Sequence, residues 1–210
     1  MTMFVSLPCS LAESRAGLAG LILGGASLLL VPAVDFLRDR GRAGLQAGVA
    51  AASGAFLLGG VAALLLQPGH LHLPPALRAA AGVLGAFFLF LLVSSLILEI
   101  PRAWGFGGRG RARLTTGGTY ALARHPGVLW LFFLLVCLSL ARASETILLA
   151  AVTWTAINIG VSTLEDRFFL PRAFGAPYDE YRGRVPFLIP TCSSIRRCIE
   201  TFRCPLRRKR

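Results

Sequence analysis

The chain has 210 residues, of which 55% are hydrophobic and only 15% are charged, and its mean hydropathy is +0.66. This composition excludes a soluble globular domain and a disordered chain, and it is typical of a helical membrane protein. The formal net charge of +12 is explained by basic loops between apolar segments, so we expect no nucleic-acid partner.

Five apolar runs follow one another along the chain, and each predicts a helix that crosses the membrane. They cover residues 17–37, 44–67, 76–100, 128–141 and 145–164. The fourth run is short for a span, so we expect its helix to begin earlier, around Tyr120 or Pro126, because proline fits the first turn of a helix. Only a few residues separate the fourth run from the fifth, which predicts a helical hairpin. The expected fold class is therefore an all-α polytopic membrane bundle of about five transmembrane helices.

Two pairs of glycines spaced four residues apart predict close contacts between helices. Gly20 and Gly24 lie in the first run, and Gly44 and Gly48 lie at the start of the second. Small residues at this spacing let two helix backbones approach each other in lipid. The alternative is that glycine is simply common in membrane helices.

The distribution of basic residues predicts the orientation of the helices. With five spans, 19 of the 22 Lys and Arg residues fall on the side that follows the first, third and fifth runs. Cytoplasmic loops carry the excess of basic residues, so this side is expected to be cytoplasmic and the N-terminus to lie outside. We therefore expect an integral protein of the cell inner membrane with a cytoplasmic C-terminus.

We expect a single integral membrane domain with four parts. An N-terminal segment is followed by three apolar runs with a basic loop, by a region of polar motifs and by a basic tail, which cover residues 1–16, 17–116, 117–190 and 191–210. In the tail, Ile195, Ile199 and Phe202 recur at helical spacing among arginines. This pattern predicts an amphipathic helix on anionic lipid headgroups, and a disordered tail is the alternative.

Some residue types that bind metals or nucleotides are not expected to do so in this chain. His70 and His72 have no acidic or cysteine residue close by in sequence, and the five cysteines form no pair with zinc-binding spacing. Residues 105–110 fit the glycine pattern of dinucleotide-binding proteins, but they follow a membrane helix rather than a strand. We therefore expect neither a metal site nor a dinucleotide site.

Two polar clusters contrast with the apolar runs. The first, residues 117–126, reads GGTYALARHP and holds the only Arg-His pair of the chain. The second begins with Glu165 and Asp166 and runs to Tyr181. The predicted hairpin lies between the clusters and would bring them to one cytosolic face, so we interpret them as one active site. The alternative is a salt bridge between Arg124 and Glu165 that joins the two ends of the hairpin.

These clusters carry a resemblance to a known family. The first resembles the G-x-Y-x-x-x-R-H-P motif of the isoprenylcysteine carboxyl methyltransferase family, whose superfamily also contains phospholipid methyltransferases and NnrU-like proteins. The second resembles the family's acidic pair, followed by L-x-x-x-F-G-x-x-Y-x-x-Y and V-P-x-x-x-P. The residues that match the second pattern are Glu165, Asp166, Leu170, Phe174, Gly175, Tyr178, Tyr181, Val185, Pro186 and Pro190. The resemblance covers residues 117–190 and rests on two motifs that agree in order and separation.

The resemblance implies a membrane methyltransferase whose methyl donor is S-adenosylmethionine. Arg124 offers a planar guanidinium suited to the donor's carboxylate, and Glu165 or Asp166 would take its ammonium or ribose hydroxyls. His125 would hydrogen-bond the cofactor or act as a base for an amine acceptor. The implied catalytic residues are Arg124, His125 and Glu165.

The implied cofactor-binding set is wider than the catalytic one. It consists of Tyr120, Arg124, His125, Pro126, Glu165, Asp166, Tyr178 and Tyr181. The three tyrosines of this set would stack on the adenine or face the sulfonium cation with their rings. Methyl transfer from a sulfonium is an in-line displacement, so positioning and desolvation of the reactants would supply most of the catalysis.

The chain departs from the family pattern at two places. Val128 stands where the family often has tyrosine, in R-H-P-x-Y. Counted back from Phe174, the usual Glu-Glu pair falls on Asp166 and Arg167, so the acidic pair of this chain is shifted by one residue. These departures bear on the substrate more than on the cofactor.

The expected acceptor is a lipid or a lipophilic small molecule that carries a carboxylate, an amine or a thiol. Two other functions stay open. One is a non-enzymatic membrane factor that keeps the fold without turnover. Val128 and the shifted acidic pair support this alternative. The other is a small transport component, which would need polar residues in mid-membrane, and Asn158 is one of few candidates.

Overall fold

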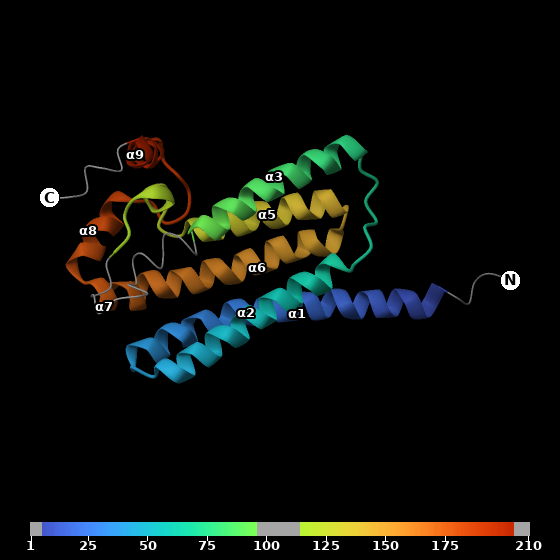
Figure 1. Ribbon diagram of the computed structural model, residues 1–210, viewed down its shortest axis with the longest axis horizontal. Coiled ribbons are helices and arrows are strands. Elements are labelled where there is room, and N and C mark those ends of the chain that lie inside the picture. Colours follow the sequence, from blue (N-terminus) through green and yellow to red (C-terminus); the bar gives the residue numbers. More distant parts are fainter. Residues whose placement is uncertain (1–5, 96–113, 204–210) are drawn as a thin grey trace. The chain divides into compact units, whose positions relative to one another are not determined.

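The computed structural model describes residues 6–95 and 114–203, and all its regular elements in these ranges are helical (Figure 1). The chain forms two compact units. The first unit comprises Met1–Ala86 and Phe132–Leu164, and the second comprises residues 87–131 and Glu165–Arg210. Predictions that concern residues 96–113, among them the end of the third run and the glycine-rich loop, lie outside the described residues.

The helices follow the order of the predicted runs. They are α1 Ser6–Asp39, α2 Ala43–Leu65, α3 Pro75–Val93, the 3-10 turn η2 Gly118–Ala121, α5 Pro126–Arg142, α6 Glu145–Leu164, the π-turn η3 Glu165–Phe169, α7 Leu170–Phe174, α8 Ala176–Arg184 and α9 Cys192–Arg203. The all-helical prediction is confirmed for the described part of the chain. So is the start of the fourth helix at Pro126.

Four helical stretches are long and apolar enough to cross a membrane. They are Arg15–Arg38, Ala43–Leu65, Pro75–Val93 and Glu145–Phe174. The apolar helix α5 is shorter, with 17 residues, which is near the lower limit of about 17–25 for a spanning helix. The helices therefore define an integral membrane protein with four candidate spans, and a fifth through α5 stays a prediction.

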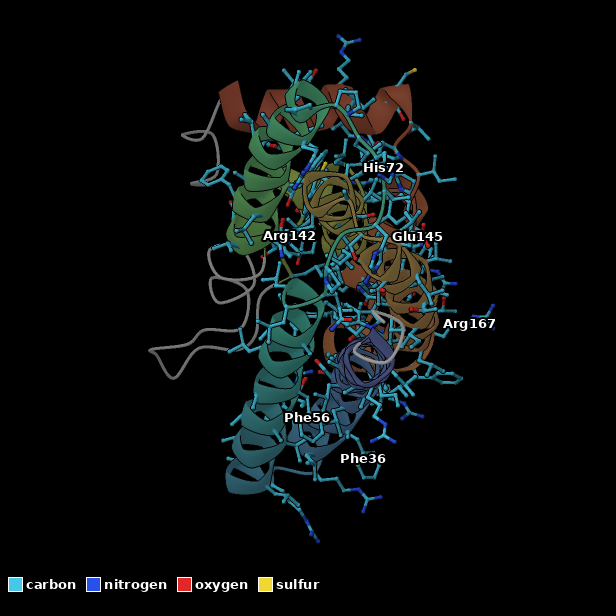
Figure 2. The ribbon with its side chains drawn as sticks, turned by 90° about the vertical axis from the view of Figure 1, so that its right-hand side faces the viewer. Phe36, Phe56, His72, Arg142, Glu145 and Arg167 are labelled. Atoms are coloured by element: carbon cyan, nitrogen blue, oxygen red, sulfur yellow. The ribbon has the colours of Figure 1, made fainter. Side chains whose placement is uncertain are left out.

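Large apolar side chains cover the outside of these helices. Leu58, Leu66 and Val83 are 73%, 81% and 76% exposed, and Phe36 and Phe56 are also exposed (Figure 2). A soluble protein rarely exposes so much apolar surface, because contact between apolar side chains and water is unfavourable. Lipid-facing helices have this property by necessity.

The first helix is longer than its apolar run. It begins at Ser6, within the segment expected to precede the first span, and it continues through Pro32 to Asp39. Backbone N–H groups in lipid need hydrogen-bond partners within the protein. The helix therefore has to keep its backbone hydrogen bonds on both sides of Pro32.

Glycines bring α1 against α2 and α6 within the first unit. A Cβ atom on Gly24 would lie 1.9 Å from Cζ2 of Trp154, and one on Gly60 would lie 2.7 Å from the Gly24 nitrogen. Trp154 is fully buried, and its Nε1 donates a hydrogen bond of 3.0 Å to the Leu21 carbonyl. The close contact predicted for Gly20 and Gly24 is therefore confirmed, since Gly20 also touches Gly60.

The same prediction is wrong for Gly44 and Gly48. No described atom would lie within 4 Å of a Cβ on either residue. Both residues lie in the first two turns of α2, whereas α2 meets α1 further along, through Ser53, whose hydroxyl donates to the Ser27 carbonyl at 2.9 Å, and through Gly60. Spacing alone does not reveal which of two glycine pairs meets a neighbour.

The connection between α2 and α3 lies against the turn between α5 and α6. Leu71 N–H donates to the Ala143 carbonyl at 3.0 Å, and the Arg142 guanidinium donates to the Leu65 carbonyl at 2.9 Å. This end of the unit faces the viewer in Figure 2, where His72, Arg142 and Glu145 are labelled. Only Ala143 and Ser144 separate α5 from α6, as expected for the predicted hairpin.

Candidate functional site

The site is built in the second unit, beginning at the η2 turn. Gly118 opens this turn with φ 66°, a conformation that glycine adopts readily and other residues rarely do. The next residue, Thr119, is buried, and its hydroxyl lies 3.0 Å from that of Ser95, which also accepts a hydrogen bond of 3.1 Å from Trp130 Nε1. This buried network fixes the backbone just before the Arg-His pair.

A short backbone pairing holds Arg124 and His125 in place. The Arg124 N–H donates to the Pro186 carbonyl at 2.9 Å, and the His125 N–H donates to the Phe187 carbonyl at 3.3 Å. The Phe187 ring lies edge-on to the His125 ring at 5.1 Å, and the Arg124 Cζ lies 5.6 Å from the centre of that ring. The Val185-Pro186 motif therefore positions the Arg-His motif through its backbone.

The acidic pair enters from the end of α6. Glu165 and Asp166 open the π-turn η3, whose hydrogen-bonded turns are wider than those of an α-helix. Asp166 is 4% exposed and Glu165 is half-buried. The two motifs, some forty residues apart in the chain, thus meet at one place.

Arg124 pairs with Asp166 rather than with Glu165. Its Nη1 lies 2.8 Å from Oδ1 and 3.0 Å from Oδ2 of Asp166. Both side chains are at least nine-tenths buried, so their attraction is screened less than that of a surface pair. A salt bridge between the ends of the hairpin was the alternative to an active site. One is present, but it uses the second acidic residue.

His125 lies between the two carboxylates. Its Nδ1 is 3.8 Å from Glu165 Oε2, and its Nε2 is 3.7 Å from Asp166 Oδ1, with 9% of the side chain exposed. These distances are too long for direct hydrogen bonds. Among the described residues, the buried nitrogens His125 Nε2 and Arg124 Nε have no hydrogen-bond partner. An unpaired buried donor or acceptor costs about 1–3 kcal/mol, so a bound ligand that satisfied both nitrogens would gain affinity.

Two of the three tyrosines pack into the scaffold of the site. Tyr178 and Tyr181 are 1% and 6% exposed and form a buried cluster with Val185. The Tyr178 hydroxyl donates a short hydrogen bond to Asp166, and the Tyr181 hydroxyl donates one of 2.8 Å to the Tyr120 carbonyl. In this conformation neither ring has an open face on which an adenine could stack.

Burial favours the protonated form of both hydroxyls. Burial raises the pKa of Tyr178, and the neighbouring Asp166 carboxylate raises it further. Burial likewise raises the pKa of Tyr181. Each tyrosine therefore acts as a hydrogen-bond donor inside the scaffold. Tyr120 is half-buried, and the ligand-facing role expected for the tyrosines stays a prediction for it.

Pro126 and Val128 are structural neighbours of the Arg-His pair. Pro126 is fully buried and begins α5, and the Val128 N–H donates to the His125 carbonyl at 3.2 Å. Val128 itself is 4% exposed, so the residue at the position where the family that the chain resembles often has tyrosine is packed inside the protein. Pro126 starts α5 directly after His125, and its buried ring leaves no surface that a ligand could contact.

The shifted acidic pair coincides with the π-turn. Arg167, on which the second family glutamate would fall, is exposed and points away from the helices (Figure 2). A π-turn holds about one residue more than an α-turn, so its side chains point in other directions than those of an α-helix. The acidic pair near Arg124 and His125 is Glu165 and Asp166.

Two residues at the site were not expected from the sequence. Phe187 touches both members of the Arg-His pair, and Arg182 Nε lies 3.6 Å from Asp166 Oδ2 while its side chain is 45% exposed. Phe187 directly follows the Val-Pro motif, which is the only sequence signal for its position. Nothing in the sequence distinguishes Arg182 from the other arginines around α8.

Comparison of the chain with models of protein families, with curated proteins and with solved structures finds no match. The resemblance to the methyltransferases accordingly rests on the motif residues between 117 and 190.

Proposed function

We propose that the protein is an integral membrane methyltransferase that uses S-adenosylmethionine to methylate a lipophilic acceptor. One observation carries this proposal. The Arg-His pair and the acidic pair, which together make up the motif resemblance, lie within 4 Å of each other and leave two buried nitrogens without partners in the described chain.

The residues fit the polar part of the proposed cofactor. Its amino-acid portion carries a carboxylate and an ammonium, and the site offers the unpaired Nε of Arg124 and the half-buried carboxylate of Glu165. Glu165 would hold the ammonium, and the free Nε of Arg124 would hold the carboxylate, because charge-assisted hydrogen bonds are the stronger ones. The bound cofactor supplies an electrophilic methyl group on a sulfonium.

The chain's own residues would orient the reactants and exclude water. Asp166 accepts hydrogen bonds from Arg124 and Tyr178 and is 4% exposed, so in this proposal it holds the Arg-His segment in place and Glu165 faces the ligand. His125 keeps one ring nitrogen unpaired and could accept a proton from an amine, a thiol or a carboxylic acid acceptor. The site directly precedes the apolar helix α5, which favours an acceptor that partitions into lipid.

A non-enzymatic membrane factor is the second candidate. It is favoured by the buried Arg124–Asp166 ion pair, since such a pair would also serve a protein without turnover as a structural clamp. A transport role has less support. Asn158, its candidate residue, is half-buried in α6.

Transfer of a labelled methyl group tests the proposal directly. The purified protein is incubated with methyl-labelled S-adenosylmethionine and a membrane extract, and the lipid fraction is assayed for label. The proposal expects label with the wild type and little with Glu165→Gln, whereas Glu180→Gln, at an exposed carboxylate of α8, should match the wild type. No label above a protein-free control would favour the non-enzymatic factor.

A further inference from the structure

The C-terminal helix α9 is docked on the η2 turn by one of its faces. The Gly118 N–H donates to the Thr201 hydroxyl at 3.1 Å, and the Arg197 guanidinium donates to the Arg184 carbonyl. Ser194, on the same side of α9, is fully buried. The helix is therefore anchored to the first residue of η2, whose positive φ makes it glycine-dependent.

The start of α9 is capped by its own side chains. The Ser194 N–H donates to the Thr191 hydroxyl at 3.2 Å, and the Thr191 N–H donates to the Ser194 hydroxyl at 2.9 Å. This reciprocal arrangement satisfies two backbone donors that would otherwise lack partners. The structured helix excludes the disordered-tail alternative for residues 192–203.

A second face of α9 is apolar and open. Ile195 and Ile199, one helical turn apart, are 44% and 46% exposed. Arg196 borders them, with 84% of its side chain exposed, and Glu200 is the only acidic residue from position 192 to the end. Seven basic residues stand in the same stretch. An apolar stripe bordered by cations complements a bilayer surface that contains anionic lipid.

Chain connectivity places this face near a membrane boundary. The turn η2 lies only a few residues before Pro126, where the apolar helix α5 begins. If α5 spans the membrane, as the sequence predicts, its first residues lie at the headgroup region. A helix that is hydrogen-bonded to η2 is consequently held close to that region.

We propose that α9 binds anionic lipid headgroups at the bilayer surface through Ile195, Ile199 and Arg196, and thereby holds the η2 turn ahead of the Arg-His pair. The occupant of the open face is thus the bilayer in which the protein resides. The proposal does not depend on methyl transfer, because it concerns only the contacts of α9 and η2.

Hydrogen exchange of the full chain in lipid nanodiscs tests the proposal. Amide exchange is compared between a phosphatidylcholine bilayer and one that also contains phosphatidylglycerol. In the anionic bilayer the amides of α9 and of η2 should exchange more slowly, by about fivefold for each arginine that reaches the headgroups. The double variant Arg196→Gln/Ile199→Ser should lose this difference.

A matched control changes one arginine and one isoleucine elsewhere in the same unit. Arg172 and Ile189 are both exposed and lie outside α9, so Arg172→Gln/Ile189→Ser should respond to anionic lipid as the wild type does. Unchanged exchange in α1 and α6 shows that each variant is folded.

A third variant separates lipid binding from its effect on η2. Thr201→Val removes the acceptor of the Gly118 N–H but keeps the shape of the side chain. It should retain the slower exchange in α9 and lose it in η2. Equal exchange of wild-type α9 in both bilayers would overturn the proposal, and so would a lipid response that survives Arg196→Gln/Ile199→Ser. The latter result would mean that anionic lipid acts on α9 through other residues, whereas equal exchange in both bilayers would leave the apolar face to a second copy or another protein.

Discussion

Asp166 is the residue on which the geometry of the candidate site depends most. It accepts hydrogen bonds from Arg124 and Tyr178, lies 3.6 Å from Arg182 and 3.7 Å from His125, and is 4% exposed. Taking a carboxylate out of water is unfavourable, and these donors offset that cost. Removing one member of such an ion pair destabilises the protein chiefly because the other charged group stays buried without a partner.

Asp166→Ala should therefore destabilise the protein strongly. It leaves the Arg124 guanidinium buried without its carboxylate, which lowers the free energy of unfolding by about 3–5 kcal/mol. Thermal unfolding in detergent measures this loss. Glu180→Ala removes an exposed partner of Arg184 and should change the stability by less than about 0.5 kcal/mol. Equal small effects from both would contradict a structural part for Asp166.

The buried tyrosines predict a loss of stability at alkaline pH. Their pKa values are raised in the folded protein, so the stabilisation is complete below the ordinary value of 10.0 and is lost as pH rises above it. Ultraviolet titration should show that two of the three tyrosines ionise only as the protein unfolds. In Tyr178→Phe one of these late ionisations should disappear. Early ionisation of all three would refute the burial of the pair.

Among the elements, the meeting of the two polar motifs could be predicted from the sequence, but the partner of Arg124 within them could not. The residue types and their order indicated that residues 117–126 and Glu165–Asp166 would meet, and they do. The partner of Arg124 was not predictable. It depends on the π-turn at η3, and no residue type marks a π-turn in a sequence.

Helix contacts show the same limit. Gly20 with Gly24 and Gly44 with Gly48 have the same spacing, yet only the first pair meets a neighbour. The difference lies in which part of α2 passes α1, and tertiary packing decides that. The apolar runs, in contrast, predicted the helices within a few residues at most ends, because lipid imposes a long apolar stretch on each spanning helix.

Matched glycine substitutions test the packing of α1. In Gly24→Ala the new methyl group would overlap the Trp154 ring, so we expect a loss of about 1–3 kcal/mol or more. Gly48→Ala fills open space in a helix and should be neutral or stabilising by about 0.5–1 kcal/mol. Thermal unfolding in detergent compares the two. A harmless Gly24→Ala would show that α1 and α6 do not pack as described.

At the scale of the whole molecule, the charge distribution makes a prediction about orientation. If α5 spans the membrane together with the four longer helices, the bend after α1 faces the cytoplasm and the connection after α2 faces outside. Single cysteines at Arg40 and His72, both exposed, should then react with an impermeant maleimide from opposite sides of membrane vesicles, in a background without the native cysteines. Reaction of both from the same side would contradict the topology.

The central claim is that Arg124, His125 and Glu165 form a binding site for S-adenosylmethionine. Calorimetry of S-adenosylhomocysteine binding to the detergent-purified protein tests it most directly. The structure changes the choice of variants, since Arg124→Ala would disturb the buried ion pair as well as the ligand. His125→Ala and Glu165→Gln are the better probes, with His70→Ala and Glu180→Gln as matched controls at exposed positions.

We expect the wild type and both controls to bind alike and each site variant to bind at least about tenfold more weakly, because each loses one charge-assisted hydrogen bond. Circular dichroism shows whether each variant remains helical. Absence of binding by a folded wild type would contradict the cofactor site and leave the Arg124–Asp166 pair as a structural clamp.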